Sequence, residues 1–545
     1  MYFLQQLRCR NRLPRVYFVF EEVIKRILLP TADVIFKNAD VITVDGKQPK
    51  SDFVAVKGNK ILVTGSKDFL NDFTGPNTRF IDCEGKTLLP GFNDAHCHIF
   101  SLLRKLTGVD LSAPEIKSIN DIQAAIKAKT VKTPSGEWVT GTDYNEFYLA
   151  EKRQPTRWEI DEVSPDNPVM ITHRSLHGCV LNSKALALAG ITIETAELPG
   201  TMIDRDVTRG GEPNGFLAEM VGYIREQVMP PISGQELKSG IKLANEQYLA
   251  QGLTSLQDAT YVNDLKRWRK YCEFKDKGTL KSRVYMMSGI DTLPEFQNAG
   301  LGFGAGDDNL RLGAVKIVPT IITEKMHPAP EELNELVLGI HQAGFQLAIH
   351  GVQSQMVDAI TCSYEYLQSV TPEFRARRHR IEHCSECPPP LMERLKKLQT
   401  VVVTHPSFTY FSGDRYLATV EKDVIPWLYR TGTLVKSGLT VGGGSDSPIV
   451  PNSPMMGIYG AVTRLTSSGQ ELNPAEKLTA AEVIKMYTLN AAYASHEENI
   501  KGSISPGKLA DMVLLSGNPT KVSAEEIKDI KVQMTVIGGK VVWEG

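Results

Sequence analysis

Short apolar runs that end in polar residues alternate with segments of helical periodicity through the middle of the chain. Such runs are typical of parallel strands that are buried on both faces. We count eight of them, at 88–96, 253–258, 283–290, 312–318, 345–350, 380–384, 401–405 and 439–446. Eight strand–helix units predict an α/β fold, the (β/α)8 TIM barrel, in which functional residues gather at the C-terminal ends of the strands.

The two ends of the chain have another texture, in which β-branched and polar residues alternate between Gly and Asn turns. We predict a small β-sandwich subdomain assembled from both termini, residues 31–86 and 500–545, beside a barrel domain at 87–499. The segment at about 105–245 is too long for one strand–helix connection and is predicted to be an insertion. Residues 1–30 make a poor secretory signal and are predicted to be an N-terminal extension.

Composition narrows the class of protein. Apolar residues make up 42% of the chain and the formal net charge is −2, which fits a globular protein with a large core. We therefore expect a small-molecule substrate, with neither nucleic acid nor a membrane as partner, and a homodimer as the default assembly. Eight cysteines in 545 residues are too sparse for a disulfide scaffold, so reduced thiols and a cytoplasmic location are predicted.

Ionisable residues stand at the ends of several predicted strands. His96 and His98 lie two residues apart and so share one face of an extended strand. His350, His383 and Asp446 each stand at or near the end of another run. Nitrogen and oxygen ligands of this kind predict a site for a divalent metal, most simply Zn²⁺, with Mn²⁺, Fe²⁺, Co²⁺ and Ni²⁺ as alternatives.

Lys316 lies inside the predicted strand at 312–318, where a lysine is rarely buried without a partner. Two interpretations stay open. The amine either reaches the rim or an ion pair, or it takes up CO2 to form a carbamate that bridges two metals.

Several of these stretches resemble the amidohydrolase superfamily. The similar segments are LLPGFNDAHCH, LAIHG, RIEHC, GGGSDSP and SISPGKLADMVLL. HRSLHGCVLNSKAL, EPNGFLAEM, GLTSLQDA and MYTLNAAYAS resemble more narrowly its type-3 branch, which includes N-substituted formamide deformylase-like and YtcJ-like metal-dependent hydrolases. The resemblance runs from about residue 33 to residue 545.

The resemblance implies roles for the strand-end residues. His96 and His98 would hold the more buried α metal, and His350 and His383 the β metal. Asp446 would bind the α metal and act as general base, and Lys316, if carbamylated, would bridge a centre of one or two metals.

The insertion supplies the predicted substrate contacts. The resemblance implies that His177 faces the substrate as a second catalytic residue, although a structural role within the insertion stays open. Tyr144 is a second candidate for stabilising an oxyanion, and Trp138, Tyr144 and Phe147 could line an aromatic wall or fill a core. His405 stands where the family commonly has Gln, and either reaches the site or bonds to a loop.

The predicted activity is hydrolysis of a non-peptide C–N bond in an amide, formamide, urea or carbamate by a metal-activated hydroxide. The same residues would serve a lactonase, esterase or phosphoesterase. A non-catalytic barrel scaffold and a redox protein built on Cys384 and Cys387 are weaker alternatives.

Overall fold

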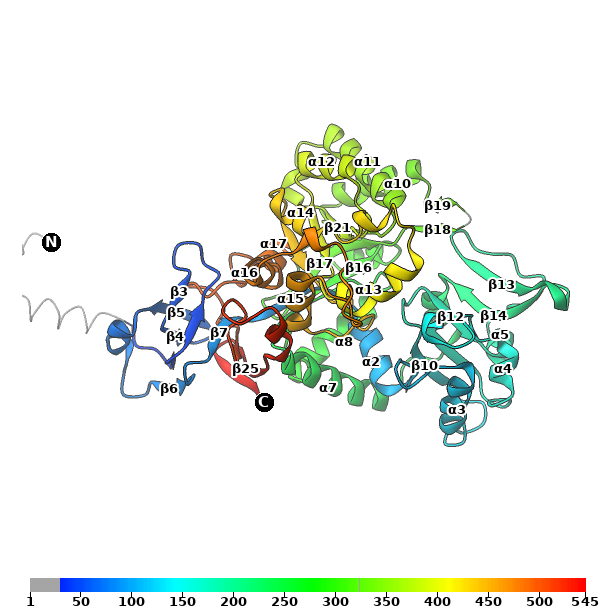
Figure 1. Cartoon of the computed structure of the whole chain (residues 1–545), viewed down its shortest axis with the longest axis horizontal. Helices are drawn as coiled ribbons and strands as arrows, with labels where there is room; N and C mark the ends of the chain where they lie inside the picture. The colour runs from blue at the N-terminus through cyan, green and yellow to red at the C-terminus, as the bar shows by residue number, and fades with distance from the viewer. Residues whose placement is uncertain (1–29, 323) are drawn as a thin grey trace, which may run out of the picture.

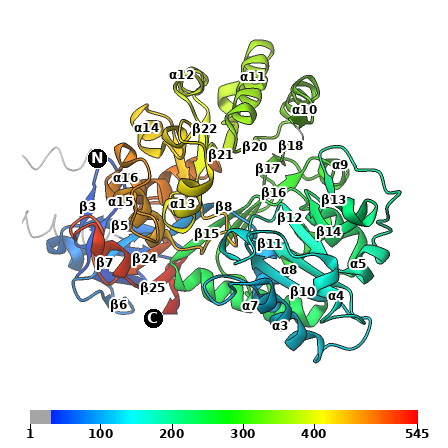
Figure 2. The same ribbon diagram turned by 45° about the vertical axis from the view of Figure 1, so that its right-hand side comes forward.

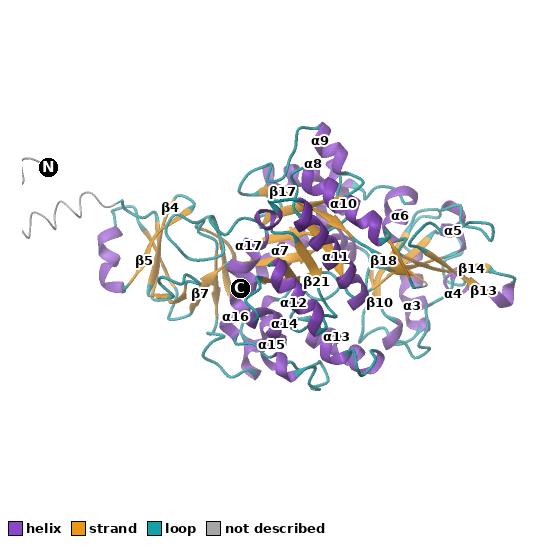
Figure 3. Cartoon of the chain, turned by 90° about the horizontal axis from the view of Figure 1, so that it is seen from above, coloured by secondary structure: helices purple, strands orange, loops and turns teal. Residues whose placement is uncertain are grey.

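The computed structural model describes residues 30–322 and 324–545. Three parts follow one another along the long axis of the molecule, with a β subdomain at one end, a barrel in the middle and an inserted α/β unit at the other end (Figures 1 and 3). The predicted N-terminal extension lies, apart from residue 30, outside the described residues.

The central part is an eight-stranded parallel sheet, which confirms the predicted TIM barrel. Its neighbouring strands follow chain order from β8 to β23, and a bridge between Cys97 and Ser447 brings the first and last strands together. The strands are β8 (Phe92–Cys97), β15 (Leu253–Asp258), β16 (Arg283–Gly289), β17 (Leu310–Ile317), β20 (Leu347–Gly351), β21 (Arg380–His383), β22 (Val401–Thr404) and β23 (Val441–Gly443). All eight predicted runs therefore contribute a barrel strand.

The first predicted run is divided between two sheets. Strand β7 (Thr87–Pro90) belongs to the β subdomain, and β8 begins the barrel two residues later. Gly91 lies at this junction, where an added Cβ would come within 2.2 Å of Thr254 Oγ1. The apolar pattern could not show this division, because both strands are fully buried.

Helices cover the outside of the barrel strands. All seven residues of β16 are buried, as expected for a strand between the barrel interior and a helical layer. Helices α10, α11 and α12 follow one another along one side (Figure 2). The helices of the barrel part are α2 (Ile99–Thr107), α7 (Gly234–Ala250), α8 (Leu265–Asp276), α9 (Leu293–Asn298), α10 (Pro330–Gln342), α11 (Ser354–Val370), α12 (Pro389–Leu398), α13 (Phe408–Thr419), α14 (Thr431–Lys436), α15 (Pro454–Thr463), α16 (Ala480–Lys485) and α17 (Ala491–Ala494).

Both chain ends contribute to the β subdomain. One sheet contains β1 (Val34–Lys37), β4 (Phe53–Lys57), β5 (Lys60–Gly65) and β6 (Arg79–Asp82). The other combines β2 (Asp40–Ile42), β3 (Lys50–Ser51) and β7 with β24 (Met512–Leu515), β25 (Val532–Ile537) and β26 (Lys540–Glu544). Side chains of both sheets, such as Val54 and Leu514, share one apolar cluster.

The insertion occupies the connection between α2 and α7. Its six-stranded sheet is formed by β9 (Val109–Asp110), β10 (Val139–Tyr144), β11 (Val169–His173), β12 (Gly178–Leu181), β13 (Met202–Asp206) and β14 (Glu212–Ala218). The helices α3 (Ile119–Thr130), α4 (Arg157–Asp161), α5 (Ser183–Leu188) and α6 (Val221–Tyr223) accompany it.

Contacts fix the insertion to loops of the barrel. Arg174 Nε donates to the Ile449 carbonyl at 2.8 Å. Thr320, in the small hairpin of β18 (Thr320–Ile322) and β19 (Lys325–His327), donates to the Gly200 carbonyl at 3.2 Å. Across residues 30–322 and 324–545, no helix is long and apolar enough to cross a membrane.

Candidate active site

A pocket opens at the C-terminal ends of the barrel strands, the end at which β/α barrels carry their active sites. One wall consists of strand-end residues, including His96, His98 and Asp446. The facing wall comes from the insertion and includes His177 and Glu219. Two parts of the chain that are distant in sequence therefore enclose one space.

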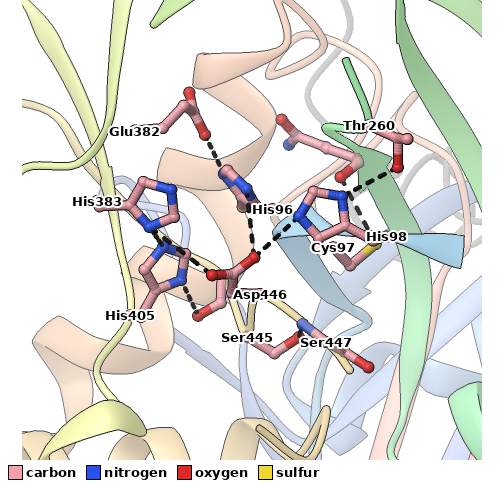
Figure 4. A network of polar contacts seen from close by, with 12 residues as sticks. His96, Cys97, His98, Thr260, Glu382, His383, His405, Ser445, Asp446 and Ser447 are labelled. Carbon is pink, nitrogen blue, oxygen red and sulfur yellow. Dashed lines mark hydrogen bonds and ion pairs between the residues drawn. The ribbon is translucent and has the colours of Figure 1, made fainter. Parts of the chain in front are cut away.

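His96, His98 and Asp446 form the first metal-compatible cluster (Figure 4). Asp446 Oδ1 lies 3.0 Å from His98 Nε2 and 3.5 Å from His96 Nε2. The approach is close because the chain before Asp446 is glycine-rich: a Cβ added at Gly444 would lie 2.8 Å from that of His96. Asp446 has a φ of 59°, a strained conformation that often accompanies functional positions.

His383 and His405 form a second cluster with His96. His383 Nδ1 lies 2.7 Å from His405 Nε2, and His405 Nδ1 lies 3.1 Å from the Gly444 carbonyl. The ring centroids of His350 and His383 are 4.4 Å apart. The structure thus brings all four predicted histidines and Asp446 to one pocket, and His405 lies buried against His96 and His383.

The hydrogen bonds indicate which nitrogen of each ring is free. A carbonyl can only accept, so His405 donates from Nδ1 to Gly444, and its Nε2 can accept from His383 Nδ1. Glu382 accepts from His96 Nδ1 in the same way. The Nε2 lone pairs of His96 and His383 are then available for a cation, as in carboxylate–histidine–metal arrangements.

Glu382 is a functional candidate that the sequence argument missed. It is fully buried and held by Arg380, whose Nε and Nη2 lie 2.6 and 2.9 Å from its two carboxylate oxygens. Neighbouring side chains of a strand point to opposite faces, so Glu382 was not expected on the same face as His383. In the sequence it stood out only as a charged residue inside an apolar run.

His98 has a similar support from strand β15. Its Nδ1 lies 3.0 Å from Thr260 Oγ1, and that hydroxyl donates to Asp258 Oδ1 at 2.6 Å. Thr260 therefore accepts from His98, which leaves His98 Nε2 facing Asp446. Asp258 was visible in the sequence as the polar end of a predicted strand, but nothing there linked it to His98.

Lys316 points into the pocket from β17. It is 2% exposed, and its Nζ has no hydrogen-bond partner among the described residues. Burial, partly offset by Glu382 and Asp446, lowers the pKa of the Lys316 amine to about 8. No carboxylate of the described chain lies within ion-pair distance of it, so the rim and ion-pair interpretations do not fit.

His177 reaches the pocket from the insertion. Its Nδ1 lies 2.9 Å from both carboxylate oxygens of Glu219, and its ring centroid lies 5.3 Å from that of His350. Burial alone would lower the pKa of His177, but the hydrogen bond and charge of Glu219 raise it above its ordinary value. The Asp446 carboxyl has a lowered pKa, since nearby His98 and His405 outweigh its burial.

Trp138 and Tyr144 lie elsewhere. Tyr144 is fully buried in the apolar core of the insertion, where its hydroxyl donates to Gln154 Oε1 at 2.8 Å. Trp138 packs against a second cluster of the insertion. Neither lines the pocket, which corrects the predicted aromatic wall: these aromatic residues stabilise the insertion.

The cysteines of the described chain are free thiols, and Cys384 and Cys387 are both buried. Cys384 follows the pocket residue His383 in sequence but is itself part of the barrel core. Both thiols are buried in the barrel core, so the arrangement gives no support to a redox site.

The donor set fits a divalent metal. The ligand atoms lie within 4.8 Å of one another in each cluster, three imidazoles in one and two imidazoles with a carboxylate in the other, and His96 Nε2 has no hydrogen-bond partner in the described chain. Buried polar atoms are normally satisfied, so these converging lone pairs indicate an ion site. Such ligands suit Zn²⁺ and its neighbours in the first transition row.

Comparison with known proteins agrees with this geometry. The chain is 28% identical to the N-substituted formamide deformylase of Arthrobacter pascens over 539 residues, which cover 94% of this chain and 98% of the relative. It is 26% identical to YtcJ of Bacillus subtilis over 535 residues, 94% and 99% of the two chains. A crystal structure of an uncharacterized metal-dependent hydrolase from Pyrococcus horikoshii matches the fold with a TM-score of 0.71 at 22% identity, covering 90% and 99%. The amidohydrolase family model matches residues 79–543, and the chain therefore belongs to the amidohydrolase family.

Proposed function

We propose that this protein hydrolyses a non-peptide C–N bond of a small molecule, in an amide, formamide, urea or carbamate, with the help of one or two bound divalent metals. The observation that carries the proposal is the convergence of His96, His98, His383 and Asp446, with free ring nitrogens, on one pocket. The similarity to a protein named N-substituted formamide deformylase supports the choice of a C–N bond.

The metal-holding residues would be His96, His98, His350, His383, Asp446 and Lys316. When bound, a divalent cation such as Zn²⁺ lowers the pKa of water from 15.7 to about 7 and polarises a carbonyl oxygen. Glu382 and Thr260 would keep the imidazoles in the required tautomer by accepting their Nδ1 protons.

Asp446 would move the proton. Its lowered pKa keeps the carboxylate ionised at neutral pH, so it can accept a proton from the attacking water and return it to the leaving nitrogen. The nitrogen of an amide is a poor leaving group until it is protonated. General acid–base transfer of this kind typically contributes about 10²–10⁴-fold to the rate.

His177 would act from the opposite wall. With Glu219 at Nδ1, its Nε2–H can donate to the oxygen that gains negative charge as the carbonyl is attacked. The raised pKa of His177 increases the fraction of the ring that carries this proton. Donors placed in this way typically contribute about 10²–10³-fold.

Lys316 is proposed to carry a carbamate. Its neutral amine would attack CO2, form an N–C bond and release one proton, and a pKa of about 8 leaves part of the amine neutral at physiological pH. The Nζ has no partner among the described residues and lines the same pocket as the imidazoles, which supports a carbamate at this position.

The test is a substrate panel of formamides, ureas, carbamates, lactones and phosphoesters, with Zn²⁺ or Mn²⁺ supplied. Turnover of the C–N substrates supports the proposal. Turnover confined to lactones, esters or phosphoesters would favour the second candidate, and less than one equivalent of metal after gentle purification would favour a non-catalytic scaffold. The cytoplasmic location and the homodimer stay predictions.

A further inference from the structure

Three arginines gather in the part of the pocket that the proposed chemistry does not use. They come from three separate elements: Arg104 from α2, Arg225 from the π-helix η4 (Ile224–Val228), and Arg267 from α8. A π-helical turn is rare and is frequently found at functional sites. The pocket therefore has a cationic end next to its metal-compatible end.

The carboxylates around this cluster are already engaged. Glu226 pairs with Arg267, and Glu219 pairs with His177. In the described chain the Arg104 side chain makes no hydrogen bond or ion pair, and Arg225 makes one bond, to Thr172 Oγ1 at 3.1 Å. Two guanidinium groups thus line the cavity without a carboxylate partner among the described residues.

This arrangement is unfavourable unless a ligand offsets it. Burial and the neighbouring Arg267 lower the pKa of Arg104, although the charge of Glu226 opposes this shift, and burial and Arg104 lower the pKa of Arg225 to about 10. Buried guanidinium groups that lie near one another and form no ion pair of their own repel one another and lose hydration. An anion between them would remove both costs.

Apolar side chains also line this end of the pocket. Phe100, Val221 and Tyr261 line it, and Tyr261 is 43% exposed. Arg267 packs with its guanidinium 5.2 Å from the centre of the Phe100 ring. A ligand that suits this region has an apolar body and an anionic end.

We propose that Arg104 and Arg225 form an anion subsite, and that the substrate of this protein is an amide-type compound whose apolar body ends in a carboxylate or phosphate. The amide part of this inference rests on the proposed function, whereas the anion subsite does not. A guanidinium presents its N–H groups as a planar fork that matches both oxyanions, which explains the choice of two arginines.

Direct binding separates this inference from the proposed hydrolysis. Phenylacetate, phenyl phosphate and neutral phenylacetamide would be titrated by calorimetry into the metal-loaded protein and its Arg104→Met and Arg225→Met variants. Arg209→Met, an exposed arginine on the insertion, is the matched control. We expect anion binding in the wild type and control, with the Kd raised about 10- to 100-fold in each pocket variant.

The outcomes are distinct. If phenylacetate binds more tightly than phenyl phosphate, the substrate carries a carboxylate. If phenyl phosphate binds more tightly, the substrate carries a phosphate. Anion binding that is unchanged in both pocket variants at equal metal content would place the anion on the metal and overturn the subsite. Equal binding of phenylacetamide would overturn it as well. If Arg225→Met does not fold, Arg225→Lys retains the charge without the fork, and an unchanged Kd there and in Arg104→Met counts against the subsite.

Hydrolysis adds a second readout. In a pair of formamides that differ only in a terminal carboxylate or carboxamide, Arg104→Met should raise KM for the carboxylate about 10-fold or more and leave the carboxamide nearly unchanged. A protein that hydrolyses both equally well refutes the subsite alone. A protein that binds the anions through these arginines but hydrolyses nothing refutes the proposed function alone.

Discussion

The two walls of the pocket are built by different means. The barrel wall carries His96, His383 and Asp446 at 1%, 4% and 7% exposure, each at or just beyond the end of a strand fixed by its neighbours in the sheet. The insertion wall carries His177, whose side chain is 41% exposed, and Arg225 on a π-helical turn. Buried strand ends hold geometry rigidly, whereas loops tolerate variation. The barrel wall is therefore suited to common chemistry and the insertion wall to substrate choice.

The largest effect should come from the barrel wall. His96→Asn removes a ring nitrogen that both clusters share, so we expect bound metal to be lost and kcat/KM to fall by more than the roughly 10- to 100-fold typical of an outer partner. Metal analysis and steady-state kinetics measure this. His327→Asn, an exposed histidine in β19, should change neither quantity. Full metal content in His96→Asn would refute the ligand assignment.

An intermediate effect is expected at Glu382, which supports a predicted metal ligand and does not itself bind the metal. Glu382→Gln removes the charged acceptor of His96 Nδ1, so the affinity for metal should fall about 10- to 100-fold. Competition with a chelator measures the affinity. Glu386→Gln, whose carboxylate accepts from the Ser354 amide, is the matched control. An unchanged metal affinity in Glu382→Gln would show that Glu382 does not orient His96 for metal binding.

The insertion wall should respond to pH. Glu219 raises the pKa of His177, so activity that needs the protonated ring is present below that pKa and is lost as pH rises through it. Glu219→Gln lowers the pKa of the ring, and the alkaline limb of kcat/KM should move to lower pH with metal content unchanged. If the alkaline limb does not move in Glu219→Gln, the titration that causes it belongs to a group other than His177.

The smallest effect is expected inside the insertion. Tyr144→Phe removes the hydrogen bond to Gln154, which should lower the free energy of unfolding by about 1 kcal/mol and leave kcat/KM within about 2-fold. Denaturant unfolding and kinetics test both parts. A tenfold loss of kcat/KM with unchanged stability would indicate that Tyr144 acts at the substrate site and contradict its role in the core.

The sequence by itself determined the barrel and the metal-compatible wall. The apolar run of a buried strand is visible in the local sequence. The polar residue that ends each run could therefore be identified without knowing which strands lie beside it in the sheet. Because parallel strands end at the same edge, His96, His98, His350, His383 and Asp446 had to meet.

Only the tertiary structure decided what supports and faces those residues. Glu382 meets His96 across 286 positions of sequence, and Tyr144 turns into a core although it lies in a polar stretch. Arg104 and Arg225 come together only because the insertion folds back over the barrel mouth. Such contacts depend on how separate layers pack, and no local periodicity records that packing.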